Sequence, residues 1–452
     1  MPFSLRSLGS SLLLSLLSLT GASPNDPHVF HSAPWFEGWY FRLHDAAADR
    51  VVGAAFGFSA PDTSTAPKGA TIHKAYIMLL LQEGQSGKLQ KLDIFPDPET
   101  VTINGRPVES SIASDPSLYR ESNFTWCATK NGCFSVDEGR VERFNLTDGG
   151  EYFLEGKIGT PVHWGTTAAD YGPMGVFAET SLIPLKWFVH TTTSQAESYR
   201  FKWGKRGPMG TAGDAAKTSV HQEKNWGDSF PTSWIWSQFS DRTTGSYAAL
   251  TFGHVTVGPF TDRPAFLLGY RNYQKTGPGG AALAADFRPD NSVIVNAHLD
   301  GCAGNFFVEL EGVEFRIQVT VTGEPSTFSD KLWGPVSYGF APVCTETFNA
   351  HVEVKLFRRD CTSVLCRSLK RAAILAHQAK VAITGVERGS GAPMDPDFKL
   401  VDSASAGFSA LEFGGGFQCG EPKGQWDLSK VKVKVVEEEE AERAYEESLI
   451  IA

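Results

Sequence analysis

The stretch Val313-Glu314-Phe315-Arg316-Ile317-Gln318-Val319-Thr320-Val321 alternates apolar and polar side chains without a break. Because successive side chains of a strand point to opposite faces, this period of two predicts a β-strand with one buried and one wet face. The same alternation recurs at 350–356 and 431–435, and turn-forming residues such as Asn104-Gly105 and Pro289-Asp290-Asn291 separate such runs. The chain is therefore predicted to be all-β and antiparallel.

Two segments depart from this pattern. Residues 363–383 carry apolar side chains at helical spacing, which predicts one amphipathic helix inserted between two strands. Residues 437–452 are acidic and are predicted to form a tail without chemistry of its own.

The length of 452 residues exceeds what one ordinary core accommodates, so two domains are expected. An internal repeat supports this division, because four residues recur in kind at one constant offset: Tyr40, Asp45, Phe56 and Gly57 match Trp236, Asp241, Phe252 and Gly253. We place the two domains at 23–215 and 216–436. Each half is expected to begin with an aromatic strand and to continue as an up-and-down meander.

Composition excludes one class of partner. The formal net charge is −10 at pH 7 and no basic stripe is present, so binding to nucleic acid or to an anionic membrane surface is not expected. Aromatic residues make up 12% of the chain, which suits either a pocket for a flat apolar ligand or ordinary aromatic packing between sheets.

Residues 1–22 have the order of a secretory signal peptide, with Arg6, then an apolar run over 8–19, then small residues. The run is shorter than the about 20 residues that span a bilayer, so cleavage and secretion of a soluble protein are expected, with a signal anchor as the alternative. The sequons at Asn123 and Asn145 are then expected to carry sugar.

The cysteine count is seven, so at least one thiol is expected to be unpaired. Cys127 and Cys133 flank Asn131-Gly132, a hairpin-turn pair, which predicts a small disulfide across that turn. The sequence has no cysteine or histidine spacing typical of a metal site and no glycine motif for phosphate or dinucleotide binding. No metal and no cofactor are therefore expected.

The longest motif in the chain is Glu223-Lys224-Asn225-Trp226-Gly227-Asp228-Ser229-Phe230-Pro231, followed by Trp234-Ile235-Trp236-Ser237-Gln238. With the segments 36–41, 172–175 and 411–415, it resembles the tocopherol cyclase and carotenoid hydratase superfamily. The resemblance spans most of residues 35 to 417. It is interrupted at 187–190, where this chain has Trp-Phe-Val-His and members often have Tyr-His-Gly-Val-x-Ser.

The resemblance implies two lipocalin-like β-barrel or sandwich domains with a ligand pocket at their junction. Members include tocopherol cyclases, carotenoid hydratases and fungal pericyclases, none of which needs a metal, nucleotide or flavin. The departure at 187–190 and the secretory signal favour the fungal branch. Within that branch, the secreted members that this chain resembles join an o-quinone methide, derived from a tropolone or phenol, to a terpene such as humulene in meroterpenoid biosynthesis.

The candidate site residues come from the long motif and from aromatic side chains elsewhere. As proton donors, orienting carboxylates or hydrogen-bond donors we single out Glu223, Asp228, Gln238 and His190. As walls of a substrate pocket we single out Trp39, Trp187, Trp236, Tyr270 and Trp333. Asn225 and Trp226 are expected to brace the turn, and Lys224 to be solvated.

Trp236 and Gln238 alternate with their neighbours, so both are expected on one strand face; if that face lines the barrel interior, Gln238 can donate to a substrate oxygen while Trp236 stacks on its ring. Each of these residues also has a structural alternative. The two carboxylates would hold the corner of the motif, a lone histidine is more often structural, and the aromatic side chains would belong to the core.

Three classes of function remain open. The first is a cofactor-independent pericyclase that performs a (hetero-)Diels–Alder coupling, in which a general acid expels water and a dry pocket holds both reactants. The second is a hydratase or an acid-catalysed chromanol-forming cyclase on the same scaffold. The third is a non-catalytic carrier of terpenoids or lipids. In each case the partners are small polyketide-derived or terpenoid molecules.

Overall fold

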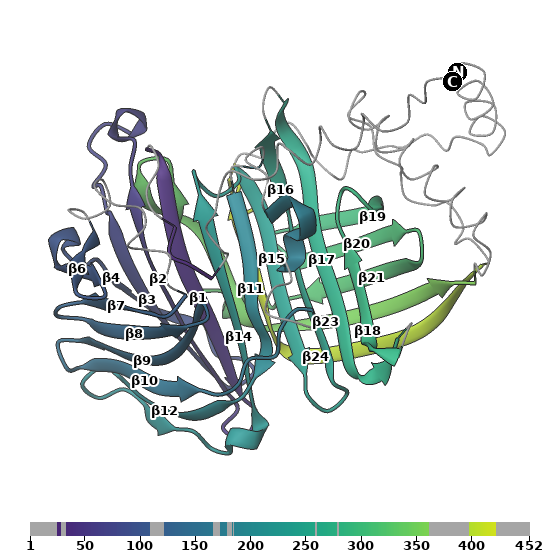
Figure 1. Cartoon of the computed structure of the whole chain (residues 1–452), viewed down its shortest axis with the longest axis horizontal. Coiled ribbons are helices and arrows are strands. Elements are labelled where there is room, and N and C mark those ends of the chain that lie inside the picture. The colour runs from purple at the N-terminus through teal and green to yellow at the C-terminus, as the bar shows by residue number, and fades with distance from the viewer. Residues whose placement is uncertain are drawn as a thin grey trace, which may run out of the picture.

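The computed structural model describes residues 25–28, 33–108, 122–165, 172–178, 183, 185–257, 260–277, 280–360 and 397–421. Nearly all of the secondary structure in these residues is strand, arranged in antiparallel sheets as the alternating pattern predicts (Figure 1). The predicted helix at 363–383, the strand at 431–435 and the tail at 437–452 lie outside the described residues.

Two sheets form the first half of the molecule. The strand order of the first sheet is β11-β14-β1-β2-β3-β4, with β1 (Trp35–Asp45), β2 (Arg50–Ala60), β3 (Ala75–Glu83), β4 (Gln90–Ile94), β11 (Leu185–Ser194) and β14 (Thr218–Gly227). The order of the second is β13-β12-β10-β9-β8-β7-β5-β6, with β5 (Val101–Ile103), β6 (Arg106–Pro107), β7 (Phe124–Ala128), β8 (Gly132–Asp137), β9 (Arg140–Asp148), β10 (Tyr152–Ile158), β12 (Ala196–Trp203) and β13 (Met209–Thr211).

The second half is one continuous sheet that lies beside the first half in Figure 1. Its order is β18-β17-β16-β15-β24-β23-β21-β20-β19, and β22 pairs with β23. The strands are β15 (Ser233–Asp241), β16 (Ser246–Val257), β17 (Phe260–Thr276), β18 (Ala282–Phe287), β19 (Ser292–Asp300), β20 (Asn305–Gly312), β21 (Phe315–Thr322), β22 (Leu332–Val336), β23 (Gly339–Arg359) and β24 (Phe398–Gly415). Short 3-10 turns connect strands in both halves: Thr63–Thr65, Pro98–Thr100, Gly172–Ala178, Ala215–Lys217 and Pro325–Thr327.

The predicted internal repeat appears in the strand register. Tyr40 of β1 lies opposite Ala55 of β2, and Trp236 of β15 lies opposite Thr251 of β16. From Glu37↔Phe58 to Asp45↔Arg50, each pair of the β1–β2 register therefore has a counterpart 196 positions later in β15–β16, and the same separation joins Arg42 to Gln238. The order β4-β3-β2-β1-β14-β11 likewise corresponds to β18-β17-β16-β15-β24-β23. The two hairpins occupy equivalent positions in their halves.

The boundary between the halves lies further along the chain than residue 215. Strand β14 pairs with β1 on one side and β11 on the other, so it belongs to the first sheet. The second half begins with β15, and the crossing is made by residues 228–232. The long motif of the sequence thus spans the last strand of one half, the crossing and the first strand of the other.

Alternation along these strands separates two environments. On β1, Trp39 and Phe41 point into the core of the first half, whereas Tyr40 packs into a cluster shared by both halves. On β15, Ile235 points into the core of the second half and Trp236 into the shared cluster. The face that carries Trp236 therefore looks toward the other half, and the opposite face, with Ile235, looks into the core of its own half.

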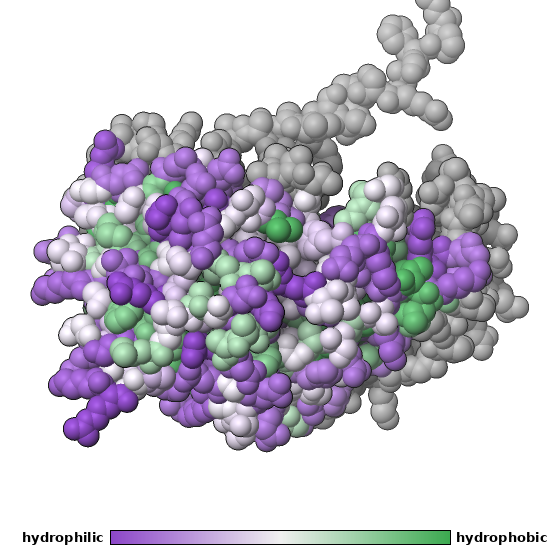
Figure 2. Space-filling view, turned by 90° about the horizontal axis from the view of Figure 1, so that it is seen from below, coloured by the Kyte–Doolittle hydropathy of each residue, from purple (hydrophilic) through white to green (hydrophobic). Residues whose placement is uncertain are grey.

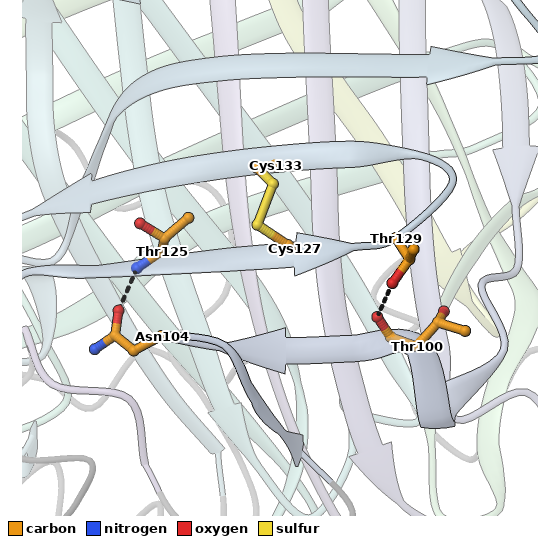
Figure 3. Close-up of a disulfide and its surroundings, with 6 residues drawn as sticks. All are labelled: Thr100, Asn104, Thr125, Cys127, Thr129 and Cys133. Atoms are coloured by element: carbon orange, nitrogen blue, oxygen red, sulfur yellow. Dashed lines mark hydrogen bonds between the residues drawn. A yellow bond between two sulfur atoms is a disulfide. The ribbon is translucent and has the colours of Figure 1, made fainter.

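Two disulfides are formed among the described cysteines. Cys127 and Cys133 join the neighbouring strands β7 and β8 across the predicted turn. In Figure 3, backbone N–H of Thr125 donates to Asn104 and the hydroxyl of Thr129 donates to the carbonyl of Thr100, so both ends of β7 are tied to its surroundings. Cys302 and Cys419 form the second disulfide, which the sequence analysis did not predict.

We expect the second disulfide to contribute more to stability than the first. The sequence separation is 117 residues for Cys302–Cys419 and 6 for Cys127–Cys133. Because a cross-link restricts the unfolded chain more when its loop is longer, the two contributions should differ by roughly 2–3 kcal/mol in the loop-entropy model. Urea unfolding of the double variants Cys302→Ser/Cys419→Ser and Cys127→Ser/Cys133→Ser measures both; equal losses would contradict the expectation.

Apolar side chains on the face shown in Figure 2 occur in small separate groups within a mainly hydrophilic surface. Asn123 and Asn145 of the two sequons are exposed, and their glycosylation stays a prediction, as does secretion. No helix among the described residues is long and apolar enough to cross a membrane.

Candidate active site

A cavity of about 700 Å³ lies between the two halves. Strands β1, β2, β3, β11 and β14 contribute its walls from the first half, and β15, β16, β17, β22, β23 and β24 from the second. The lining is mostly aromatic and aliphatic, and includes Tyr40, Tyr76, Met78, Trp187, Phe230, Trp234, Trp236, Leu267, Trp333 and Phe340. Binding sites for small molecules typically measure roughly 300–1,000 Å³, so the cavity has the size and the apolar character of such a site.

Glu223 of β14 lines this cavity and accepts hydrogen bonds from several side chains. The indole N–H groups of Trp187 and Trp236 both donate to its Oε2, at 2.8 and 3.0 Å. Nε2 of His221 lies 3.0 Å from the same oxygen, and the amide of Asn225 donates to Oε1 at 3.3 Å. Since an indole N–H can only donate, this set of neighbours suits an ionised carboxylate. The predicted residues Glu223, Trp187, Trp236 and Asn225 are therefore one assembly.

A second pair of carboxyl groups faces the cavity from the other half. Glu346 of β23 lies directly opposite Glu412 of β24 in the strand register, and both line the cavity. Directly opposed residues of antiparallel strands have Cβ atoms about 4.5–5.5 Å apart, so these two carboxyls are close neighbours. Tyr40 donates its hydroxyl to Glu346 at 3.2 Å across the junction, and the indole of Trp234 donates to Glu412.

The surroundings of this pair favour its protonated form. Burial, together with repulsion from Glu412, raises the pKa of Glu346 well above its usual range. Burial is also the main cause that raises the pKa of Glu412, to about 7. At neutral pH the pair therefore retains a proton that two solvated glutamates would lose. An acidic proton held in an apolar cavity is the basic requirement for general acid catalysis.

Gln238 lies at the centre of the junction and outside the cavity lining. Its Oε1 accepts from the guanidinium of Arg42 at 3.1 Å, and only 1% of Gln238 is exposed. Arg42 also donates to the carbonyl of Phe408. Arg42 and Gln238 are equivalent positions of the two halves, so this contact ties β1 to β15. Gln238 was predicted to donate to substrate, but its buried side chain is not part of the cavity lining, so its amide does not reach a ligand held there.

Three other predicted residues also lie away from the cavity lining. Asp228 is exposed, because it follows the last residue of β14 where the chain leaves the sheet. His190 is buried on the opposite face of β11, against Phe188, and burial lowers its pKa well below the usual range. Tyr270 lies opposite Ala248 in the core of the second half and donates to Asp402 at 2.8 Å.

The remaining predicted residues divide between the cavity and the core. Trp333 lines the cavity. Trp39 stacks on Phe56 within the core of the first half, with ring centroids 5.1 Å apart. It also contributes to the cavity lining. Trp226 stacks on His28 at 4.3 Å and so braces the segment that precedes β1. Lys224, expected to be solvated, is fully buried.

Sequence reasoning missed Tyr40, Glu346 and Glu412 as site residues. A signal for Glu346 was present, because it occupies the buried phase of the alternation that continues as Ala350, Val352 and Val354. A carboxyl at such a buried position must be neutral or have a hydrogen-bonding partner, since burying an unpaired charge is costly. Among the described residues, no group of three or more His, Cys, Asp or Glu side chains is arranged to hold a metal ion.

By its fold and its site, the chain is an all-β protein with a small-molecule cavity between two related halves. The sequence matches the tocopherol cyclase-like family over residues 162–390, half of the chain, and the protein belongs to that family. Family membership points to an enzyme of the cyclase or hydratase type. None of the curated proteins matches the sequence.

Several solved structures have a similar arrangement. CghA has a TM-score of 0.45 and 8% sequence identity, covering 88% of this chain and 96% of CghA. CghA with Sch210972 has a TM-score of 0.44 and 9% identity, covering 88% and 97%. Kievitone hydratase from Nectria haematococca has a TM-score of 0.42 and 10% identity, covering 75% and 86%.

Proposed function

We propose that the protein is a cyclase that couples an o-quinone methide, derived from a tropolone or phenol, to a terpene alkene in a (hetero-)Diels–Alder reaction. The observation that carries the proposal is the pair Glu346 and Glu412, opposed carboxyls with raised pKa values that face an apolar cavity of about 700 Å³. Such a cavity has room for a ring system and an apolar hydrocarbon together. All acid and base groups in the proposal belong to the protein.

The pair supplies the step that makes the reactive species. A hydroxymethyl group beside a ring hydroxyl receives a proton from Glu412, its C–O bond breaks, and one water molecule leaves. The ring hydroxyl then returns a proton to the carboxylate left on Glu412. The net change is loss of water, and the pair regains its starting state. General acid–base assistance of this kind is typically worth about 10²–10⁴-fold in rate.

The coupling that follows needs the two reactants to be held together. The aromatic side chains of Trp187, Trp236 and Trp333 provide flat apolar walls against which a ring can stack. Holding both partners in a near-attack arrangement removes much of the entropic barrier of a bimolecular reaction. The same walls select which face of the alkene is attacked.

The acid pair also supports a second candidate, protonation of an isolated alkene. Addition of water would then make the protein a hydratase, and capture by a ring hydroxyl would make it a chromanol-forming cyclase. Both start from the same proton on Glu346 or Glu412, so the products distinguish them. A carrier of terpenoids would bind such molecules and leave them unchanged.

The test is chromatography of the products from a hydroxymethyl phenol or tropolone and humulene, with and without the protein. We expect a single stereoisomer of the coupled product with the protein and a mixture without it. A product ratio that the protein does not alter would refute the coupling. Hydrated alkene, or bound and unchanged ligand, would identify the second candidate or the carrier.

A further inference from the structure

The charged side chains that line the cavity are all of one sign. Glu223, Glu346 and Glu412 reach it, and no lysine, arginine or histidine is among the described residues of its lining. The apolar cavity therefore offers negative charge and acidic protons to a ligand, with no cationic side chain to bind an anion.

The carboxylate of Glu223 has donors around it but no cationic partner in the lining. The hydroxyl of Tyr247 lies 3.1 Å from Nδ1 of His221, while Nε2 of the same ring lies 3.0 Å from Glu223. A neutral imidazole satisfies both contacts by accepting at Nδ1 and donating at Nε2. Burial lowers the pKa of His221, which keeps this ring neutral. The negative charge of Glu223 is thus solvated by dipoles and left without a balancing cation in the cavity.

Aromatic rings surround the same carboxylate. Trp187 and Trp236 hold its Oε2, and the ring of Tyr40 packs edge-on against Trp236 with centroids 5.4 Å apart. The faces of such rings attract cations, the more strongly where water is excluded. A carboxylate in a cavity lined by aromatic rings is a combination that suits a weakly hydrated organic cation.

We infer that the cavity selects ligands that carry or develop positive charge at carbon or nitrogen, and that Glu223 sets this selectivity. This selectivity rests on the proposed function and explains one part of it. A hydroxymethyl precursor that loses water develops positive charge at the carbon beside the ring. Glu223 stabilises that charge while Glu346 and Glu412 deliver the proton. A substrate that enters as a carboxylate anion is rejected by repulsion.

The experiment compares three ligands of similar shape by calorimetry at about pH 6, where solvated carboxylates are ionised. They are (1-naphthylmethyl)trimethylammonium, its uncharged isostere 1-neopentylnaphthalene, and 1-naphthylacetate. We expect the ammonium to bind about tenfold tighter than the isostere, and the acetate to bind weakest. Equal affinities, or tightest binding of the acetate, would overturn the inference without any variant.

Variants then assign the effect to one residue. Glu223→Gln should abolish the preference for the ammonium and change affinity for the uncharged isostere by less than about twofold. Glu346→Gln, which replaces a protonated carboxyl in the same cavity, should keep the preference. A preference that survives Glu223→Gln would overturn the role of this residue. Because these readouts are binding constants, they stand apart from the product assay, and failure of the coupling would leave them unchanged.

Discussion

Glu412→Gln is expected to lower kcat/KM near neutral pH by about 10²–10³-fold, because it removes the acidic proton while keeping the size of the side chain. The pKa of Glu412 is raised to about 7, so this carboxyl can both give and regain a proton near neutral pH. Glu346→Gln should cause a loss of similar size, since the two carboxyls face each other across β23 and β24. Steady-state kinetics of the coupling reaction measures both.

A control on the same strand separates chemistry from folding. Glu353 lies on β23 with its side chain exposed, on the opposite phase of the alternation from Glu346. Glu353→Gln removes a carboxyl without touching the cavity, so its activity should stay within about twofold of the parent. If Glu412→Gln and Glu353→Gln retained equal activity, the acid pair would have no part in the reaction.

Lys224→Met is expected to destabilise the fold by about 3–5 kcal/mol, because it leaves a buried carboxylate without its partner. Nζ of Lys224 lies 2.6 Å from Oε1 of Glu37, and neither side chain is exposed to solvent. His28 adds a contact of 3.0 Å to the same oxygen, and Lys224 also donates to the carbonyl of Asp26. The ion pair therefore fixes the segment before β1 onto β1 and β14.

A double variant tests this explanation. Lys224→Met combined with Glu37→Gln removes both charges and keeps an acceptor for His28, so it should recover about half or more of the lost stability. Urea unfolding of the parent, the two single variants and the double variant gives the coupling energy between the two residues. A loss below about 1 kcal/mol for Lys224→Met would contradict a structural role for the pair.

The all-β class and the repeat could be read from local patterns in the sequence. Strand alternation depends on neighbouring residues only, and Ile317, Val319 and Val321 are buried as that pattern predicts. The constant offset of the repeat also needs no long-range information. The boundary could not be found in this way, because the partners of β14 are β1 and β11, and pairing between distant segments leaves no local mark.

The candidate site was predictable where the motif itself forms it. Glu223 and Trp236 lie within one continuous stretch, and they meet through a direct hydrogen bond of 3.0 Å. Gln238 and Tyr270 were misplaced because alternation tells which residues share a face but not what that face meets. Glu346 and Glu412 come together only through the pairing of β23 with β24, which joins segments far apart in the chain.

The pH dependence of kcat/KM for the coupling of a hydroxymethyl phenol tests the acid pair most directly. A phenol hydroxyl titrates near about 10, so the substrate contributes no change between about pH 5 and 8.5. The pKa of Glu412 is raised to about 7, and the acid is active when protonated. The rate should therefore be highest at low pH and fall about tenfold per unit as the pH rises above that value. In Glu412→Gln the remaining rate should lose this limb. A rate that is flat across this range, or that rises with pH, would contradict general acid catalysis by Glu346 and Glu412.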